Sequence, residues 1–342
     1  MGEYLEKHFD KFFPKYDDQT LLEEICAFKN HSIVKIKKLE NHFFKEVRFN
    51  AKYFSSQRAN VVEEYDTPYD LLNNDKYIQR LIDEVLYTEK NKNFFGESSE
   101  QQRIETYLRF CGGIASNFDS KHVLQMQDYA KTYFDDYFTR FNVHDPSCGW
   151  GTRMMVTILR NNNYFGTDPN SKLNEKLNEA CTFLRTQNKR VKGDIRCQGS
   201  EIFIPEWEDK MDYSFTSPPY FDMEIYTKED TQSINKHGTG DTGYKNWVEY
   251  FVKPTVANIH KYVKNGGFAS INIKNIKKYN LYDDWFNAFK THGGFEFHEE
   301  LVLKWASTKT VIKSDDSNTL ETQEDTDKNN YQEKVMIFKV VK

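Results

Sequence analysis

The pattern of apolar and polar residues divides the chain near residue 110. Before that point, apolar residues recur every three to four positions, as in residues 21–28 and 71–86, and this spacing predicts amphipathic helices. After it, short apolar runs alternate with helical patterns, which is typical of a doubly wound α/β sheet. We therefore expect a mainly helical region over residues 1–110 and an α/β domain over residues 111–342.

Strands and helices of this second region can be assigned individually. Strands are predicted at residues 141–145 and 164–168, in a short run ending before 192, and at 211–216, 266–273, 295–305 and 334–341. Helices are predicted at residues 152–159, 174–184, 247–263 and 282–292. Residues 306–331 are rich in Ser, Thr, Asp, Glu and Asn, so they cannot bury enough apolar area to order themselves. That segment is predicted to be a mobile loop.

Bulk composition narrows the compartment and the type of partner. No stretch approaches 18 consecutive apolar residues, so no membrane span is expected. The N-terminus lacks the basic and apolar run of a signal peptide, and five cysteines without a C-x-x-C pair indicate neither a disulfide framework nor a zinc site. The nine histidines form no ligand cluster, so no metal is expected. These features predict an intracellular protein, cytoplasmic or nucleoid/nuclear, that is not secreted.

The net charge of −5 argues mildly against nucleic acid as a partner.

A glycine-rich turn follows the first predicted strand. The segment Asp145–Arg153 reads Asp-Pro-Ser-Cys-Gly-Trp-Gly-Thr-Arg and leads into a predicted helix. Gly149 and Gly151 let the backbone approach a ligand closely, and the helix N-terminus supplies unpaired N–H groups. A dinucleotide-binding turn would have a third glycine where this chain has Met154. Asp145 suits a cationic amino group and repels a diphosphate. For the glycines alone, an ordinary strand-to-helix turn is the alternative.

Acidic residues accompany the next two predicted strands. Asp168 lies about 20 residues after the turn, where a carboxylate can accept hydrogen bonds from both ribose hydroxyls of a nucleoside. Asp194 follows the predicted third strand and is a candidate acceptor for an adenine amine. For either residue alone, a helix cap is the simpler interpretation. Their placement after successive strands favours a nucleoside site at one edge of the sheet.

A proline-rich loop, Ser217–Tyr220, follows the fourth predicted strand. Its two prolines fix φ and remove two N–H donors, which leaves a stiff loop presenting carbonyl oxygens and the Ser217 hydroxyl. The Ser217 oxygen and the Pro218 carbonyl can hold the hydrogens of a nucleobase amine and shift its nitrogen toward sp³, so that no strong general base is required. Tyr220 is a candidate platform for an extruded base, worth ~1–3 kcal/mol of stacking. Taken alone, the loop is also explained as a rigid turn.

With both motifs in this order, the chain resembles the class I S-adenosylmethionine-dependent methyltransferases over about residues 111–342, and in particular the DNA N6-adenine and N4-cytosine amino-methyltransferases. In that family an (F/D)-x-x-x-G-x-G turn binds the cofactor and a (D/N/S)-P-P-(Y/F/W) loop is catalytic, which Asp145–Gly151 and Ser217–Tyr220 match. The family's segment before the turn is similar to Asn117-Phe-Asp-Ser. The resemblance implies a Rossmann-like, seven-stranded methyltransferase sheet of the α/β class, with S-adenosylmethionine as cofactor.

The resemblance, together with the residue chemistry above, assigns the site. Cofactor binding is expected from Asn117, Phe118, Asp145, Ser147, Cys148, Gly149, Gly151, Asp168, Asp194 and Ile195. Catalysis is expected from Ser217, Pro218, Pro219 and Tyr220, and substrate binding from Phe221, Tyr226 and Lys274. Many Ser-Pro-Pro-Tyr enzymes carry the two motifs in the reverse order, so adenine and cytosine both stay open as the target base. Cytosine C5 methylation is disfavoured, because it needs a cysteine nucleophile, usually in a Pro-Cys pair, and the chain has none.

Several surfaces are candidates for recognising the target. Residues 222–244 form a long insertion after the proline loop, which can close over a base or be a surface loop without that role. Basic clusters at 185–196 and 274–278 can contact phosphate, and a solvated helix end explains the first equally well. The N-terminal region is our preferred candidate. Its basic stretch 29–48 is explained either as a solvated helix face or as a nucleic-acid surface.

The sequence therefore predicts a DNA amino-methyltransferase that methylates the exocyclic amine of adenine (N6) or cytosine (N4). RNA, a protein or a small-molecule amine is the alternative substrate, which the acidic net charge keeps open. A non-catalytic methyltransferase-like subunit is a further alternative, although such a subunit has no physical need for an intact Ser-Pro-Pro-Tyr loop. A homodimer is also left open, and no membrane partner is expected.

Overall fold

The computed structural model describes residue 19 and residues 118–134, 140–223, 225–226, 230–302 and 334–342. The predicted helical region 1–110, the predicted mobile loop 306–331 and Asn117 lie outside the described residues. The predictions made for them stay predictions.

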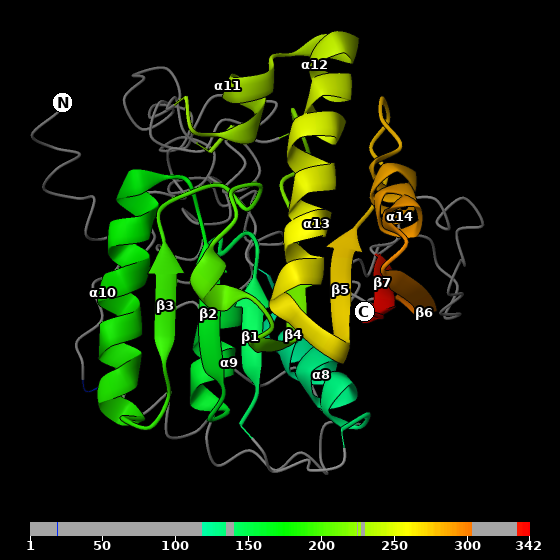
Figure 1. The fold of residues 1–342 in the computed structure, drawn as a ribbon. Helices are drawn as coiled ribbons and strands as arrows, with labels where there is room; N and C mark the ends of the chain where they lie inside the picture. The colour runs from blue at the N-terminus through cyan, green and yellow to red at the C-terminus, as the bar shows by residue number, and fades with distance from the viewer. Residues whose placement is uncertain (1–18, 20–117, 135–139, 224, 227–229, 303–333) are drawn as a thin grey trace, which may run out of the picture.

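The described chain forms a seven-stranded sheet in the order β3-β2-β1-β4-β5-β7-β6 (Figure 1). Its strands are β1 (Asn142–Asp145), β2 (Asn163–Thr167), β3 (Gly193–Arg196), β4 (Met211–Thr216), β5 (Val263–Ile273), β6 (Phe295–Val302) and β7 (Lys334–Val340). Strands β1 to β5 are parallel to one another, whereas β7 runs antiparallel to both β5 and β6. The predicted α/β class and seven-stranded sheet are therefore confirmed.

Helices cover both faces of this sheet. They are α8 (Ser120–Lys131), α9 (Thr152–Leu159), α10 (Ser171–Gln187), α11 (Ser233–His237), α12 (Gly240–Trp247), α13 (Lys253–Tyr262) and α14 (Leu281–His292), with a 3₁₀ turn at Pro205–Trp207 and a π-helical turn at Val248–Val252. Figure 1 shows α13 in front of the sheet. The helix predicted at 247–263 is in fact a run that begins at Gly240, continues through the π-helical turn and ends at Tyr262.

Two apolar cores lie on the two faces of the sheet. On β7, Val335 and Ile337 belong to the core formed with α8, α9 and α10, whereas Met336 and Phe338 belong to the core formed with α11 to α14. Successive side chains of a strand point to opposite faces, so a strand covered on both faces reads as a continuous apolar run. Burial on both sides explains why the pattern Lys-Val-Met-Ile-Phe predicts this strand well.

The insertion 222–244 is more structured than a flexible loop. It contains α11 and the first part of α12, and Ile234 and Trp247 are buried in the core. The indole nitrogen of Trp247 donates a hydrogen bond to the Ser233 hydroxyl at 3.1 Å. Aromatic burial therefore orders the described part of a segment whose glycines and polar residues suggested mobility.

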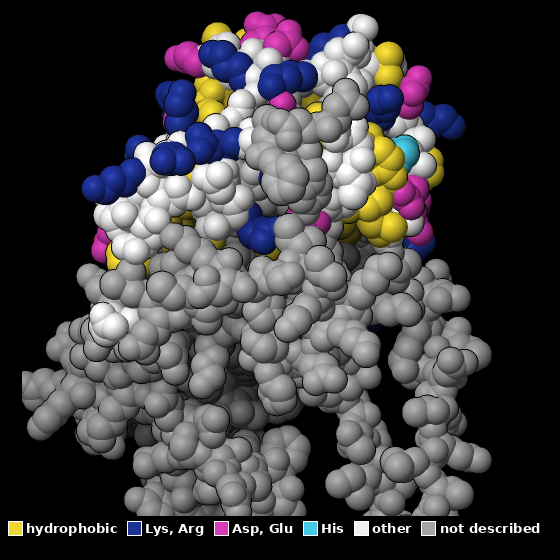
Figure 2. Space-filling model, turned by 90° about the horizontal axis from the view of Figure 1, so that it is seen from below, with side chains coloured by type: hydrophobic (Ala, Val, Ile, Leu, Met, Phe, Trp, Pro, Cys, Tyr) yellow, Lys and Arg dark blue, Asp and Glu magenta, His cyan; other side chains and the backbone are white. Residues whose placement is uncertain are grey.

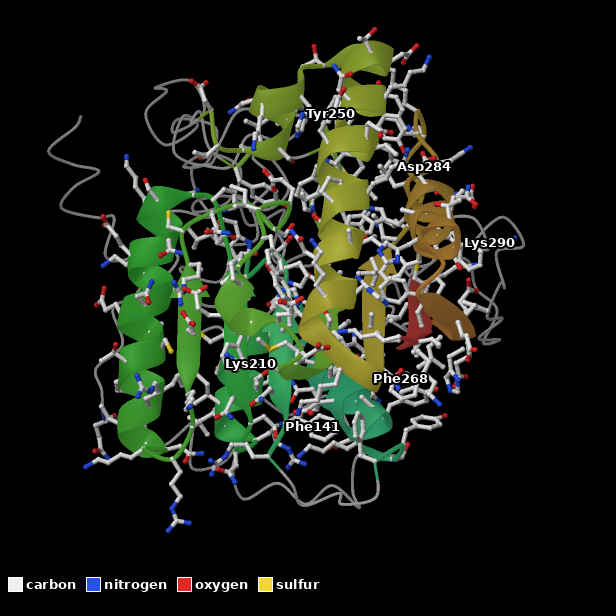
Figure 3. All side chains as sticks on the ribbon, in the orientation of Figure 1. Phe141, Lys210, Tyr250, Phe268, Asp284 and Lys290 are labelled. Atoms are coloured by element: carbon white, nitrogen blue, oxygen red, sulfur yellow. The ribbon has the colours of Figure 1, made fainter. Side chains whose placement is uncertain are left out.

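The two edges of the parallel sheet differ in position and content. Phe141 and Lys210, labelled in Figure 3, immediately precede β1 and β4 and mark the amino-terminal edge. The loops that carry both sequence motifs leave the strands at the opposite, carboxyl edge.

None of the helices in the described part of the chain is long and apolar enough to span a membrane.

Candidate functional site

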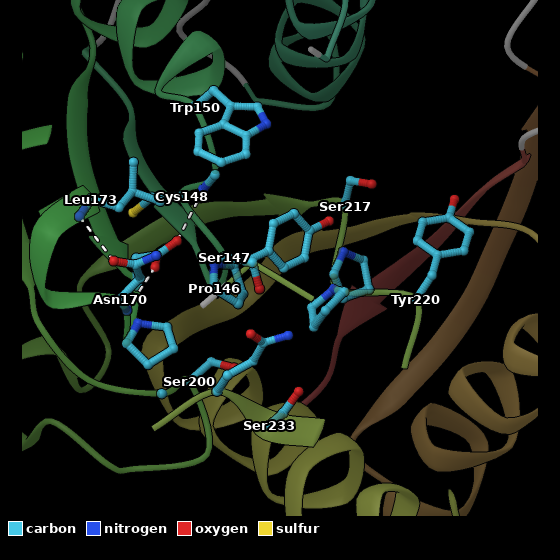
Figure 4. A pocket seen from close by; sticks show the side chains of 18 of the residues that line it. Pro146, Ser147, Cys148, Trp150, Asn170, Leu173, Ser200, Ser217, Tyr220 and Ser233 are labelled. Carbon is cyan, nitrogen blue, oxygen red and sulfur yellow. Dashed lines mark hydrogen bonds between the residues drawn. The ribbon is translucent and has the colours of Figure 1, made fainter. Parts of the chain in front are cut away.

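A cavity opens at the carboxyl edge of the sheet, beside the point where the strand order reverses between β1 and β4. Ligands bind at such reversal points in open α/β sheets. The glycine turn forms one wall of the cavity through residues 146–150, and the proline loop forms another through residues 217–220. Figure 4 shows residues of both loops around the cavity, among them Ser147 and Trp150 of the turn and Ser217 and Tyr220 of the loop. The tertiary structure thus brings together the two motifs that the sequence separates.

The glycine turn has the left-handed backbone that its composition indicates. Gly149 has φ 52° and Gly151 has φ 72°, a region that residues with a Cβ rarely adopt. Gly151 is the N-cap of α9 and makes no side-chain cap bond, so the first N–H groups of this helix face the cavity side without a capping side chain. The turn therefore lets a ligand approach the backbone closely, although the N–H groups of Ser147, Cys148, Gly149 and Gly151 already bond protein acceptors.

Cys148 packs beneath the turn and lines the cavity. It is 1% exposed, and burial raises the pKa of its thiol well above the usual value. A Cβ added at Gly166 would lie 2.4 Å from the Cys148 sulfur, so the glycine on β2 makes room for it. A thiol that stays protonated and enclosed is a small packing residue and not a nucleophile.

Asp145 is a correction to the sequence-based expectation. Its carboxylate is fully buried and does not line the cavity. It accepts hydrogen bonds from the Arg153 Nε at 2.9 Å, the Tyr164 hydroxyl at 2.8 Å, the Thr216 hydroxyl at 3.0 Å and the Ser147 N–H at 3.3 Å. Each carboxylate oxygen is thus engaged by protein donors, and the amino group of a ligand has no access to it. Asp145 instead ties β1 to β2, α9 and the end of β4.

Arg153 is the charged group that the cavity wall does present, and the sequence analysis did not assign it. Its side chain is 7% exposed and lines the cavity, with its guanidinium 5.5 Å from the Phe118 ring. Burial acts to lower the pKa of Arg153, but the charge and hydrogen bond of Asp145 together with the neighbouring Tyr164 and Cys148 outweigh it, so the pKa is raised and the group stays ionised. Its place in the first turn of the helix after the glycines was the signal available in the sequence.

Asp168 lies at the end of β2 and lines the cavity. Its carboxylate accepts the backbone N–H of Gly149 at 3.3 Å and that of Asn170 at 3.1 Å. Burial raises the pKa of this carboxyl from 3.8 to about 7, because the two backbone hydrogen bonds only partly offset the loss of hydration. Asp168 is therefore a buried acceptor whose charge state changes near neutral pH.

Asp194 and Ile195 are further corrections. Both lie within β3, which begins at Gly193, and neither lines the cavity. Asp194 accepts hydrogen bonds from Arg196 at 2.6 Å and from the Trp207 indole at 3.0 Å, and it lines a separate hollow at the amino-terminal edge. Ile195 is 8% exposed and belongs to the apolar core. The difference comes from the position of the third strand. The sequence pattern predicts that this strand ends before Asp194, whereas β3 includes Asp194.

Residues beyond the true end of β3 take the place expected for Asp194. Ser200 and Glu201 line the cavity, and Glu201 forms an ion pair with Lys236 of α11 at 2.7 Å. The other carboxylate oxygen of Glu201 is buried and has no hydrogen-bond partner. The Ser200 hydroxyl and carbonyl are held by Thr255 and Asn258 of α13, at 2.8 and 2.9 Å. A strand end placed five residues later, at Arg196, would have pointed to this segment.

The proline loop presents Ser217 to the cavity beside Asn272 of β5. The amide nitrogen of Asn272 donates to the Ser217 oxygen at 3.4 Å, and Asn272 is 1% exposed. Pro218 and Pro219 also line the cavity. Asn272 was not assigned from the sequence, because nothing in a strand pattern shows which side chain ends at a neighbouring loop.

Phe221 is corrected from substrate binding to packing. It is 1% exposed, does not line the cavity and adopts φ 55°, which is uncommon for a bulky residue. Its ring centroid lies 5.2 Å from those of Tyr244 and Tyr279 and 5.7 Å from that of Trp247. An aromatic cage therefore fixes the chain immediately after the catalytic loop candidate.

The remaining candidates divide by position. Tyr220, Tyr226 and Phe118 line the cavity, and the Tyr226 ring contacts Trp150 of the glycine turn in a T-shaped pair at 6.0 Å. Lys274 follows the end of β5 at the same edge of the sheet but is not a cavity-lining residue. The structure therefore brings three aromatic candidates to the cavity and leaves the lysine outside it.

The two basic clusters lie at opposite edges. Lys189, Arg190 and Lys192 are exposed in the connection from α10 to β3, which is at the amino-terminal edge. Seen from below in Figure 2, Lys and Arg side chains gather along one rim of the described surface. Exposed Lys277 and Lys278 instead follow β5, at the carboxyl edge near the cavity.

No group of three or more His, Cys, Asp or Glu side chains suited to a metal ion occurs within the described residues.

No protein-family model matches the sequence, and no curated protein matches it significantly. Solved structures that are similar include a TehB-like SAM-dependent methyltransferase from Corynebacterium glutamicum, with 12% identity, a TM-score of 0.36 and coverage of 65% of this chain and 97% of that one. Magnesium protoporphyrin IX methyltransferase from Synechocystis PCC 6803, solved with bound SAM, has 7% identity, a TM-score of 0.41 and coverage of 78% and 96%. A SAM-dependent O-methyltransferase from Thermotoga maritima has 10% identity, a TM-score of 0.39 and coverage of 67% and 68%. Likeness at this level identifies neither the reaction nor the substrate.

Proposed function

We propose that this protein is an S-adenosylmethionine-dependent methyltransferase acting on an exocyclic amine of DNA, adenine N6 or cytosine N4. One observation carries the proposal: the glycine turn and the Ser-Pro-Pro-Tyr loop line the same cavity at the strand-order reversal. A donor seated on the turn and an amine held by the loop would then be neighbours. Each motif alone has a structural explanation, but their meeting at one cavity is the arrangement that methyl transfer to an amine requires.

The cavity residues fit this cofactor. Asp168 offers a carboxylate to the ribose hydroxyls, and the buried, unpartnered oxygen of Glu201 is a hydrogen-bond acceptor suited to an adenine amine. Leu173 adds an apolar surface to the same part of the cavity. When bound, S-adenosylmethionine supplies an electrophilic methyl group on a sulfonium sulfur.

The loop residues supply positioning. The Ser217 oxygen accepts one hydrogen bond from Asn272, so a lone pair is left to hold a hydrogen of the target amine. The Pro218 carbonyl is the second acceptor, and Tyr220 is the platform on which the base stacks. The amine lone pair forms the bond to the methyl carbon while the carbon–sulfur bond breaks, and the amine proton leaves to solvent. The acceleration comes from orientation and electrostatics.

The resemblance of the Ser-Pro-Pro-Tyr motif to DNA amino-methyltransferases supports DNA as the substrate, whereas stacking on Tyr220 suits a base of either nucleic acid. RNA or another amine is the alternative, and the net charge of −5 favours keeping it in the test. The basic clusters do not decide between them, because Lys189–Lys192 lie at the edge opposite the cavity.

The deciding experiment offers isotopically labelled S-adenosylmethionine with DNA, RNA or protein, followed by mass spectrometry of the digested products. Labelled N6-methyladenine or N4-methylcytosine from DNA is expected. Ser217→Ala should abolish most of the label, whereas Ser171→Ala, a serine outside the cavity lining, should leave it intact. Label in RNA or protein alone would move the substrate assignment there. Cofactor binding without transfer to any substrate would indicate a non-catalytic subunit.

A further inference from the structure

The cavity wall holds a buried cation whose purpose the packing does not explain. Arg153 uses its Nε to bind Asp145 and one Nη2 hydrogen to bind the Ser147 carbonyl. A guanidinium carries five N–H donors, so three have no protein partner among the described residues. The side chain is 7% exposed, so water cannot freely satisfy those donors.

The guanidinium lies beside the glycine turn. A Cβ built on Gly149 would lie 3.7 Å from the Arg153 Nη2, which places this nitrogen next to the Gly149 backbone. The residue also belongs to the first turn of α9, whose N-cap provides no side-chain acceptor. The Arg153 donors without a protein partner therefore lie beside the Gly149 backbone and the N-terminus of α9, where both the cation and the helix dipole favour an anion.

The charges around the cavity leave a single cation to receive that anion. Among the described residues that line it, Arg153 is the one Lys or Arg. Lys236, nearby on α11, is already paired with Glu201 at 2.7 Å. Asp145 carries the matching negative charge, but its oxygens are engaged by four protein donors, so it holds the arginine in place without blocking its outer donors.

We propose that Arg153 binds the α-carboxylate at the amino-acid end of the cofactor. This inference rests on the proposed cofactor but is independent of the methylated substrate. A carboxylate matches a guanidinium edge with two parallel hydrogen bonds, and such charge-assisted bonds are strong in a desolvated site. Asp145 becomes a positioning residue that orients Arg153. The protein thus recognises the amino-acid end of the cofactor through its carboxylate. The sequence alone had suggested that Asp145 contacts the amino group instead.

The test compares ligands that differ in the carboxylate. Isothermal titration would measure S-adenosylmethionine, decarboxylated S-adenosylmethionine and 5′-methylthioadenosine, which lacks the amino-acid end. The wild type should prefer S-adenosylmethionine to its decarboxylated form by about tenfold or more. In Arg153→Gln that preference should fall to near unity, while binding of 5′-methylthioadenosine changes by no more than about threefold.

Controls separate this role from folding. Arg160→Gln removes an arginine at the far end of α9, paired with Asp128 at 3.3 Å and outside the cavity lining, and should keep the full preference. If Arg153→Gln fails to fold because Asp145 is left unpaired, the double variant Asp145→Asn with Arg153→Gln is neutral and decides instead. A preference retained without Arg153, or absent from the wild type, overturns the inference. Failure of all three ligands to bind the wild type overturns the proposed function as well.

Discussion

The two walls of the cavity are held in different ways. The glycine turn sits on a buried polar network in which Asp145 engages donors from α9, β2 and β4. Among the described residues, the Ser217 side chain of the proline loop has one hydrogen bond, from Asn272, and the loop is otherwise fixed by its two prolines and by the aromatic cage around Phe221. Charge and hydrogen bonding organise the first wall, and covalent stiffness and packing organise the second.

Substitutions in the two walls should therefore affect different properties of the protein. A buried charged network loses several interactions when one member is removed, so the turn wall should affect folding and cofactor binding. The loop wall leaves its serine oxygen only lightly engaged, so changes there should affect the chemical step while the fold persists. Four variants or conditions test this contrast.

Asp145→Ala should give the largest effect on stability. It leaves Arg153 as a buried, unpaired charge, and the expected loss in the free energy of unfolding is about 3–5 kcal/mol. Urea denaturation measures it. Asp128→Ala, which breaks the more exposed pair with Arg160, should cost ~1 kcal/mol or less. Equal losses in the two variants would contradict the assigned role of the buried network.

Ser217→Ala should reduce kcat by roughly 10²–10³-fold, the range seen when one group that stabilises a reacting centre is removed. The melting temperature and the dissociation constant of S-adenosylmethionine should stay near those of the wild type, because the side chain takes part in no core network. Single-turnover kinetics and titration would separate the two quantities. Weaker binding of S-adenosylmethionine with an unchanged kcat would contradict the assigned role of Ser217 in the chemical step.

Asn272→Ala should lower kcat by about tenfold, the equivalent of one hydrogen bond that holds Ser217. In the Ser217→Ala background the same change should cost nothing more, since the group it positions is gone. Asn162→Ala is the matched control: this asparagine is also 1% exposed, but it bonds Gln127 and the Phe141 backbone outside the cavity. Additive losses in the double variant would show that Asn272 acts independently of Ser217.

The smallest expected effect is a pH dependence of cofactor affinity. The pKa of Asp168 is raised to about 7, and the ionised carboxylate accepts two hydroxyl hydrogens, so affinity should rise between roughly pH 6 and 8, by up to about tenfold. Because the folded pKa lies above the unfolded value of 3.8, the ligand-free protein should lose stability as the pH rises from about 4 to 7. Asp168→Asn should flatten both profiles. A pH dependence of affinity or stability that persists in Asp168→Asn would arise from another titratable group.

Local patterns were sufficient for most of the fold. The helix predicted at 152–159 has the same bounds as α9, and the strand predicted at 211–216 has the same bounds as β4. Periods of 3.6 and 2 residues are imposed by which face is buried, so they are visible in the sequence. The helix predicted at 247–263 began too late, because Gly240 and Gly243 look like turn residues and only packing in the aromatic core makes them helical.

The sequence by itself determined the seven-stranded α/β sheet, the position of the glycine turn and the stiffness of the proline loop, because these depend on burial periodicity and on backbone freedom. Tertiary structure decided where individual side chains point. It turned Asp145 inward onto Arg153, kept Asp194 within β3 and enclosed Phe221 among aromatic rings. The physical reason is that side-chain direction depends on strand register and on partners distant in the chain, and a shift of one residue reverses the face.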